Sequence, residues 1–126
     1  MTLNSLTVFI ITAAPVNTAL PVITGMAQVG QMLTASDGTW TNSPTSYAYQ
    51  WNSSAGAAIS GATASTYTPA TGDIGNTLTF TVVATNSIGP SSPATSATTP
   101  AVIAVAAGPS LIVDLSMATG MLPLAA

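Results

Sequence analysis

A two-residue alternation in segment 77–85, interrupted only by Val83, restricts the fold of this chain more than any other feature. Threonine occupies most of the odd-numbered positions, and apolar residues occupy the even-numbered ones: Leu78, Phe80, Val82 and Ala84. Successive side chains of a β-strand point to opposite faces, so a strand here would have one apolar face and one threonine face. The segment is therefore predicted to be a half-buried antiparallel strand.

The rest of the central part of the chain, 15–104, is interrupted by turn residues at short intervals. Gly, Pro, Asn and Asp recur throughout, and the apolar residues show no sustained helical spacing. Short runs separated by turn signals every ~8–12 residues are typical of all-β sandwiches and barrels. We expect further strands in the following segments: 22–24, 31–35, 46–51, 57–60, 65–68 and 95–103.

Trp51 is expected to lie at the centre of the core. It shares one face of its strand with two tyrosines, and Leu33 should also point inward from its own strand. We expect the indole ring to pack on Phe80 and Tyr67, because aromatic side chains bury large areas and dominate core energetics. Since the chain has no cysteine, this core must hold without a disulfide.

The charge composition excludes several functions. The chain has no Lys, Arg or His, and its formal net charge is -3. Nucleic-acid binding and attraction to an anionic membrane both need basic side chains, while disulfide frameworks and zinc sites need Cys or His. No run approaches the ~20 apolar residues that cross a bilayer, and the first residues lack the basic start of a secretory signal. We expect a soluble, unprocessed chain without nucleic-acid or membrane partners.

Three aspartates, Asp37, Asp73 and Asp114, are the remaining candidates for acid–base or metal chemistry. General acid–base catalysis needs a tunable group, and a Ser or Thr nucleophile needs a base beside it. A pair formed by Asp37 and Asp73, or a calcium site, would use the available carboxylates. Both residues stand in glycine-containing turns, which favours hairpin turns and backbone capping instead. We predict no enzyme activity, no cofactor and no metal site.

A series of motifs in chain order resembles a bacterial and phage immunoglobulin-like domain family over about 15–102. The motifs are PVITG at 21–25, QVGQMLTA at 28–35, GTW at 38–40, YAYQW at 47–51, ISGA at 59–62, STYT at 65–68, DIGNTL at 73–78 and ATNSIG at 84–89. The resemblance implies an all-β fold, an immunoglobulin-like antiparallel β-sandwich at 15–104. Such modules occur in bacterial surface proteins and as appended domains of phage structural proteins. One departure is segment 52–58, which is shorter than in many family members.

Apolar segments flank this module at 1–14 and 105–126, outside the resemblance. A sandwich of this size fills its inner faces with its own strands, so exposed apolar tails would drive association. We expect both to be docking tails that bind a partner. The alternative is that the first adds a strand to its own sheet and the second packs as a short helix on its own domain. The expected partner-binding residues are Leu3, Leu6, Phe9, Ile11, Leu111, Ile112, Val113, Leu115, Met117, Met121, Leu122 and Leu124.

Trp40 stands outside the clear alternation and has two possible roles. An exposed indole ring would suit adhesive contact with a sugar. Because tryptophan is highly buried on average, a role in covering an open end of the sandwich is favoured.

Together these features favour a phage virion structural protein, namely a capsid decoration (cement) or head-fibre subunit on the outer surface of the particle. Its apolar termini would bind a major capsid protein or another virion protein, in a homo-oligomer or symmetric lattice, and the module would be displayed. The alternative is a bacterial cell-surface or adhesion module that binds a host surface or glycan, with Trp40 or Tyr47 as contacts.

Overall fold

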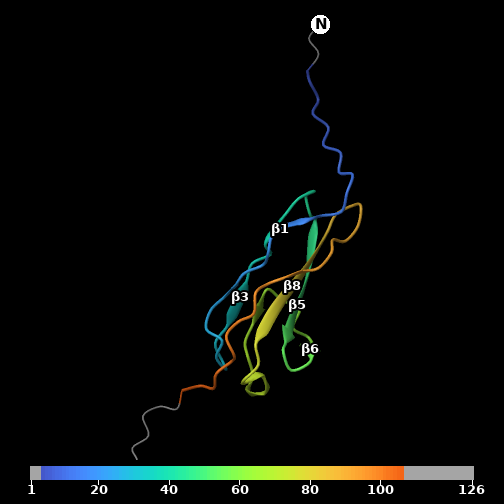
Figure 1. Cartoon of the computed structure of the whole chain (residues 1–126). Helices are drawn as coiled ribbons and strands as arrows, with labels where there is room; N and C mark the ends of the chain where they lie inside the picture. The colour runs from blue at the N-terminus through green and yellow to red at the C-terminus, as the bar shows by residue number, and fades with distance from the viewer. Residues whose placement is uncertain (1–3, 107–126) are drawn as a thin grey trace, which may run out of the picture.

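Short β-strands make up nearly all the regular structure in the computed structural model, which describes residues 4–106 and every side chain among them except that of Ala57. One 3₁₀ turn, η1 (Thr71–Asp73), is the other regular element of this part. The strands are β1 (Asn17–Ala19), β2 (Ile23–Thr24), β3 (Leu33–Ala35), β4 (Thr39–Trp40), β5 (Ser46–Ser53), β6 (Ala57–Ala58), β7 (Thr66–Tyr67), β8 (Leu78–Thr85) and β9 (Ala94–Thr95). The described part of the chain is therefore all-β, as its turn-rich sequence predicts (Figure 1).

Three antiparallel groups contain these strands. β1 pairs with β4, a second sheet has the order β2-β3-β7, and a third has the order β6-β5-β8-β9. The β5–β8 ladder runs in continuous register from Ser46 opposite Thr85 to Ser53 opposite Leu78. Figure 1 shows these two strands side by side along the long axis of the body. We name the two ends of the body after this ladder, the Thr85 end and the Leu78 end.

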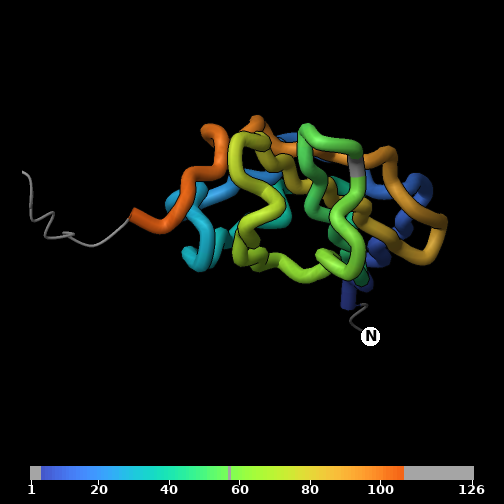
Figure 2. The backbone as a smooth tube through the Cα atoms, turned by 90° about the horizontal axis from the view of Figure 1, so that it is seen from below, coloured from blue at the N-terminus to red at the C-terminus, as the bar shows by residue number. Residues whose placement is uncertain are grey.

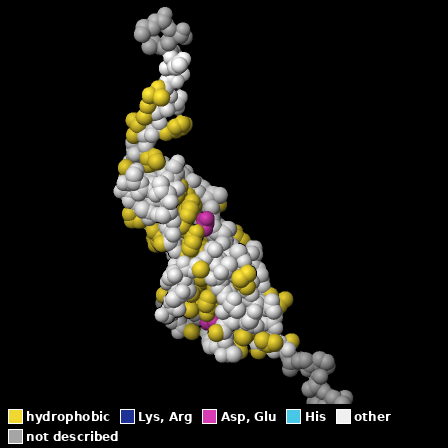
Figure 3. Space-filling model, turned by 180° about the vertical axis from the view of Figure 1, so that it is seen from behind, with side chains coloured by type: hydrophobic (Ala, Val, Ile, Leu, Met, Phe, Trp, Pro, Cys, Tyr) yellow, Lys and Arg dark blue, Asp and Glu magenta, His cyan; other side chains and the backbone are white. Residues whose placement is uncertain are grey.

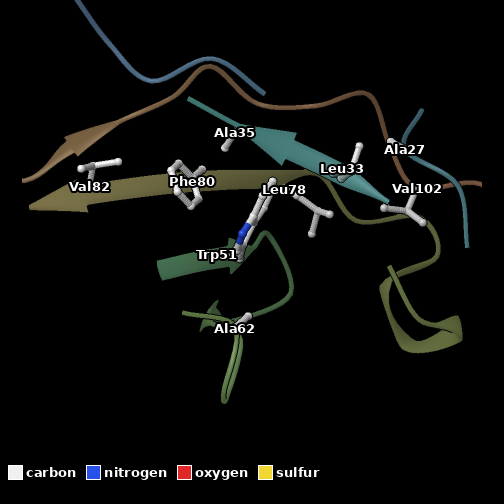
Figure 4. Packing of buried hydrophobic residues seen from close by; sticks show 9 residues of the cluster. All are labelled: Ala27, Leu33, Ala35, Trp51, Ala62, Leu78, Phe80, Val82 and Val102. Carbon is white, nitrogen blue, oxygen red and sulfur yellow. The ribbon is translucent and has the colours of Figure 1, made fainter. Parts of the chain in front are cut away.

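The hydrophobic core lies between β3 on one side and β5 and β8 on the other. Leu33, Trp51 and Phe80 are 0% exposed. The indole of Trp51 lies 5.0 Å from the Phe80 ring and 5.7 Å from the Tyr67 ring, centroid to centroid, which confirms the predicted packing. Along β8 the residues alternate between buried and half-buried, also as predicted. Figure 4 shows buried side chains from all three strands in one cluster, an arrangement consistent with a β-sandwich.

The prediction of a strand at 95–103 is wrong for most of that segment, because β9 ends at Thr95. Beyond it, hydroxyl side chains take the place of a backbone ladder. The Ser96 N–H donates to the Phe80 carbonyl at 2.9 Å, and the Ser96 Oγ accepts from the Phe80 N–H at 3.0 Å. One serine thus satisfies both backbone groups of a buried residue of β8.

The same arrangement recurs at two other positions of β8. Thr99 bonds both backbone groups of Leu78 at 2.9 and 3.0 Å. Ser91 does the same for Ala84 at 2.7 and 3.0 Å. Each of the three hydroxyls also donates to the carbonyl of the residue that follows it. We call Ser91, Ser96 and Thr99 together the hydroxyl edge.

The connection at Asp37–Gly38 is not the hairpin turn that its sequence predicts. It leads from β3 in one sheet to β4 in another group, so the chain changes sheets here. Gly38 has a φ of +77°, and a Cβ on it would clash with the Ala19 carbonyl oxygen. The Asn17 Nδ2 donates to the carbonyls of Ala19 and Thr39 at 2.8 and 3.1 Å. The β1–β4 pair, which no sequence period indicates, depends on this close approach.

Candidate docking site: the N-terminal arm and the two ends of the body

Residues 4–12, which we call the arm, are extended and belong to no strand. Figure 1 shows the arm in blue, leading away from the body. Its large apolar side chains are exposed: Leu6 85%, Val8 66%, Phe9 88% and Ile10 77%. Two predicted docking residues, Leu6 and Phe9, are thus on the surface, while Ile11 is half-buried. The arm adds no strand to its own sheet.

Asn86 fixes the point where the arm meets the body. Its side chain is 5% exposed, and its Nδ2 donates to the backbone carbonyls of Ala13 and Asn42, both at 2.8 Å. The Asn42 Nδ2 in turn donates to the Ala14 carbonyl at 2.8 Å. The Oδ1 of Asn86 accepts from two backbone N–H groups of the turn that follows it. Because both sides of this buried amide are bonded, the arm begins at a defined place on the Thr85 end.

The last described residues lie at the opposite, Leu78 end. Val102 is buried and makes backbone hydrogen bonds with Gly75 and Asn76, each at 2.9 Å. Ile103 forms a parallel bridge with Gln28, and Figure 2 shows these two segments, one orange and one blue, next to each other. The two ends of the described chain therefore leave the body in opposite directions (Figure 1).

The other predicted docking residues lie outside the described residues 4–106, as does Asp114. They are Leu3, Leu111, Ile112, Val113, Leu115, Met117, Met121, Leu122 and Leu124.

A shallow apolar groove of about 510 Å³ lies at the Leu78 end. Met26 and Ile103 on its walls are 60% and 54% exposed. Figure 3 shows hydrophobic side chains both on the arm and around the opposite end of the molecule. We call this groove the end groove, and its lining is Gly25, Met26, Ala27, Pro100, Ala101 and Ile103.

Asp37 and Asp73 are each bonded to a different tyrosine, and Figure 3 shows two separate acidic spots. The Tyr49 O–H donates to Asp37 at 2.8 Å, and the Tyr67 O–H donates to Asp73 at 2.7 Å. Burial, together with the bonded carboxylate, raises the pKa of each tyrosine to about 12. Asp73 also accepts from the Ala70 N–H at 2.8 Å, which confirms its predicted capping role. Its turn is not the predicted hairpin, because β7 before it and β8 after it belong to different sheets. Within residues 4–106, no three potential metal ligands lie together.

The aromatic rings of the body form one continuous chain, with centroid separations of 5.0 to 6.5 Å. Trp40 at one end packs on the core and donates through Nε1 to the Asp37 carbonyl at 2.7 Å, in line with the covering role. Tyr47 beside it is 37% exposed. Phe9 on the arm stands outside this chain. In order, the chain is Trp40, Tyr47, Tyr49, Phe80, Trp51 and Tyr67.

Within the part of the chain that the structure describes, no helix is long and apolar enough to cross a membrane. A scan of protein-family models and searches of curated proteins and of solved structures found nothing that matches this chain.

Proposed function

We propose that this chain is a phage virion structural protein, a capsid decoration or head-fibre subunit that docks through its apolar termini and displays an immunoglobulin-like module on the outer surface of the particle. The expected partner is a major capsid protein or another virion protein. The observation that carries the proposal is the exposed apolar arm.

The sheet order supports the immunoglobulin-like part of this proposal. If β2, β3 and β7 are strands A, B and E, then β6, β5, β8 and β9 correspond to strands C′, C, F and G. Trp51 then stands on strand C with its ring in the core, the position of the buried tryptophan in that fold. The sequence motifs that resemble the family lie in the same order along the chain.

The arm supports the docking part. Four large apolar side chains within five consecutive residues, 6–10, are between 66% and 88% exposed. Soluble monomers rarely expose large contiguous apolar patches, and those that exist mark interaction sites. The buried hydrogen bonds of Asn86 hold the base of the arm, and the exposed side chains of the arm lie away from the body.

The low charge of the chain fits life inside an assembly. A net charge of -3 from Asp alone gives a free monomer weak protection against association. When the arm is buried in a neighbour, its apolar surface is no longer exposed, so charge repulsion is not needed to prevent non-specific association. Many copies on one lattice would also add their individually modest contacts.

Particle occupancy tests the proposal directly. Full-length chain and a Leu6→Asp/Phe9→Asp variant are supplied during growth of the phage, and copies per purified particle are counted by mass spectrometry. We expect at least ~10-fold lower occupancy for the variant, because buried aromatic and apolar anchors dominate interface energy. Met32→Asp, at a 61% exposed apolar residue of the body, is the matched control and should attach normally.

Deletion of 105–126 examines the second tail in the same assay, and we expect it to abolish attachment. If the deletion and the arm variant both retain parental occupancy, the docking proposal is wrong.

A cell-surface or adhesion module is the second candidate, and the exposed ring of Tyr47 favours it. Its ring is nearly parallel to that of Tyr49, at 7°, with centroids 6.4 Å apart. Flat aromatic surfaces suit sugar rings. A glycan array is screened with the full chain and with Tyr47→Ala. This candidate predicts a glycan that the parent binds and the variant does not. If the parent binds none of the glycans, this candidate is rejected.

A further inference from the structure

We propose that the end groove binds the arm of a second copy of this chain, so that copies join head to tail. The inference names one partner of the arm and rests on the docking role proposed above, but it does not depend on the identity of the particle.

Geometry excludes the arm of the same copy from the end groove. The arm begins at the Thr85 end, where Asn86 bonds Ala13, and the end groove lies beyond the Leu78 end. Phe9 is four residues from Ala13, so it reaches at most ~14 Å from that point. The eight-residue β8 between the two ends spans about 24 Å. The Phe9 of one copy therefore cannot enter its own end groove.

The chemistry of the two surfaces matches. The walls of the groove offer Met26 and Ile103, both more than half exposed, and the flexible thioether side chain of methionine adapts to irregular apolar partners. Neither the groove nor the arm contains a charged side chain. Docking therefore buries no charge, and the usual cost of desolvating an ion is absent.

The positions of the two surfaces determine the kind of assembly. An arm at one end and a groove at the other make a heterologous contact, which leaves one unused arm and one unused groove on every dimer. Such a contact extends into a row of copies. One arm in one groove covers less than the ~800 Å² per partner of a standard interface, so each contact should be weak and reversible.

Sedimentation velocity of the full chain over a range of concentrations tests the inference. We expect the parent to form dimers and longer rows as concentration rises. Phe9→Asp in the arm and Met26→Asp in the groove should each raise the dissociation constant at least ~10-fold. Met32→Asp matches Met26→Asp in residue type and in exposure, 61% against 60%, and should assemble like the parent. Thermal unfolding of every variant verifies that the body is intact.

Mixing the two defective variants gives the sharpest result. Phe9→Asp retains a sound groove and Met26→Asp retains a sound arm, so an equimolar mixture should form dimers and nothing larger. Any of four results would overturn the inference. The parent could stay monomeric, the variants could assemble like the parent, only one of the two variants could lose assembly, or the mixture could stay monomeric. Particle occupancy is measured separately: attachment without self-assembly removes this inference alone, and self-assembly without attachment removes the virion proposal alone.

Discussion

The two edges of β8 are held by different means. On one edge β5 pairs with all eight residues of β8 through a regular backbone ladder. On the other edge β9 pairs with only Thr81 and Val82, and the hydroxyl edge bonds Leu78, Phe80 and Ala84. The comparison shows that a strand can be bonded on one side by a regular ladder and on the other largely by single residues, each of which uses its backbone N–H and its hydroxyl together. The two solutions should respond differently to mutation.

The largest effect is expected on the ladder side. Trp51→Ala removes the side chain that packs between Phe80 and Tyr67, and we expect a loss of about 3–5 kcal/mol in the free energy of unfolding. Urea denaturation followed by circular dichroism measures it. Tyr47→Ala, on the same strand but 37% exposed, is the control and should cost clearly less. Equal costs would mean that the ring of Trp51 is not the centre of the core.

The hydroxyl edge should give the next largest effects. Thr99→Val keeps the shape of the side chain but leaves the buried Leu78 N–H without its partner, and Ser96→Ala does the same to Phe80. We expect each to cost about 1–3 kcal/mol, the penalty for an unsatisfied buried donor. Thr95→Val on the exposed side of β9 is the control, expected within ~0.5 kcal/mol of the parent.

If Thr99→Val and Thr95→Val destabilise the chain equally, the hydroxyl of Thr99 has no special role in holding the outer edge of β8. Hydrogen exchange of the Leu78 amide gives a local check, because exchange there should accelerate only in Thr99→Val.

Alkali should produce a smaller and more gradual loss. Tyr49, on the ladder side, has a pKa raised from 10.0 to about 12, as does Tyr67. A group whose pKa is higher in the folded state stabilises it below the unfolded value, so this contribution is complete below pH 10 and is lost as the pH rises from 10 to 12. Unfolding free energies measured across that range should fall, and fall less in Tyr49→Phe. A pH-independent stability would contradict the Tyr–Asp bonds.

The ladder side could be predicted from the sequence because its period is visible. The alternation from Leu78 to Ala84 and the placing of Trp51 follow from strand geometry and side-chain size alone. The hydroxyl edge could not be predicted from the sequence, because serine and threonine in a proline-containing segment are equally typical of an exposed loop. Only the fold places Ser96 and Thr99 opposite the backbone of β8.

Some features of the candidate docking site could likewise be predicted from the sequence, and others could not. The apolar composition of the arm is evident in the sequence, so Leu6 and Phe9 could be named as docking candidates from it, and both are exposed in the structure. The role of Asn86 could not be predicted from the sequence, because its hydrogen-bond partners lie 44 and 73 residues away along the chain. The end groove was also missed, since it is assembled from segments 25–27 and 100–103 that meet only in the folded chain.

The hydroxyl edge has a consequence for aggregation. The outer edge of a sheet is a template for foreign strands, and charged side chains, lysine in particular, are one common protection. This chain has no lysine to use as such a gatekeeper. The N–H groups of Leu78, Phe80 and Ala84 are bonded by the three hydroxyls and their carbonyls by the backbone N–H groups of the same three residues, so β8 offers little to a passing strand. A nearly uncharged protein can thereby protect this side of β8 from strand addition without a charged side chain.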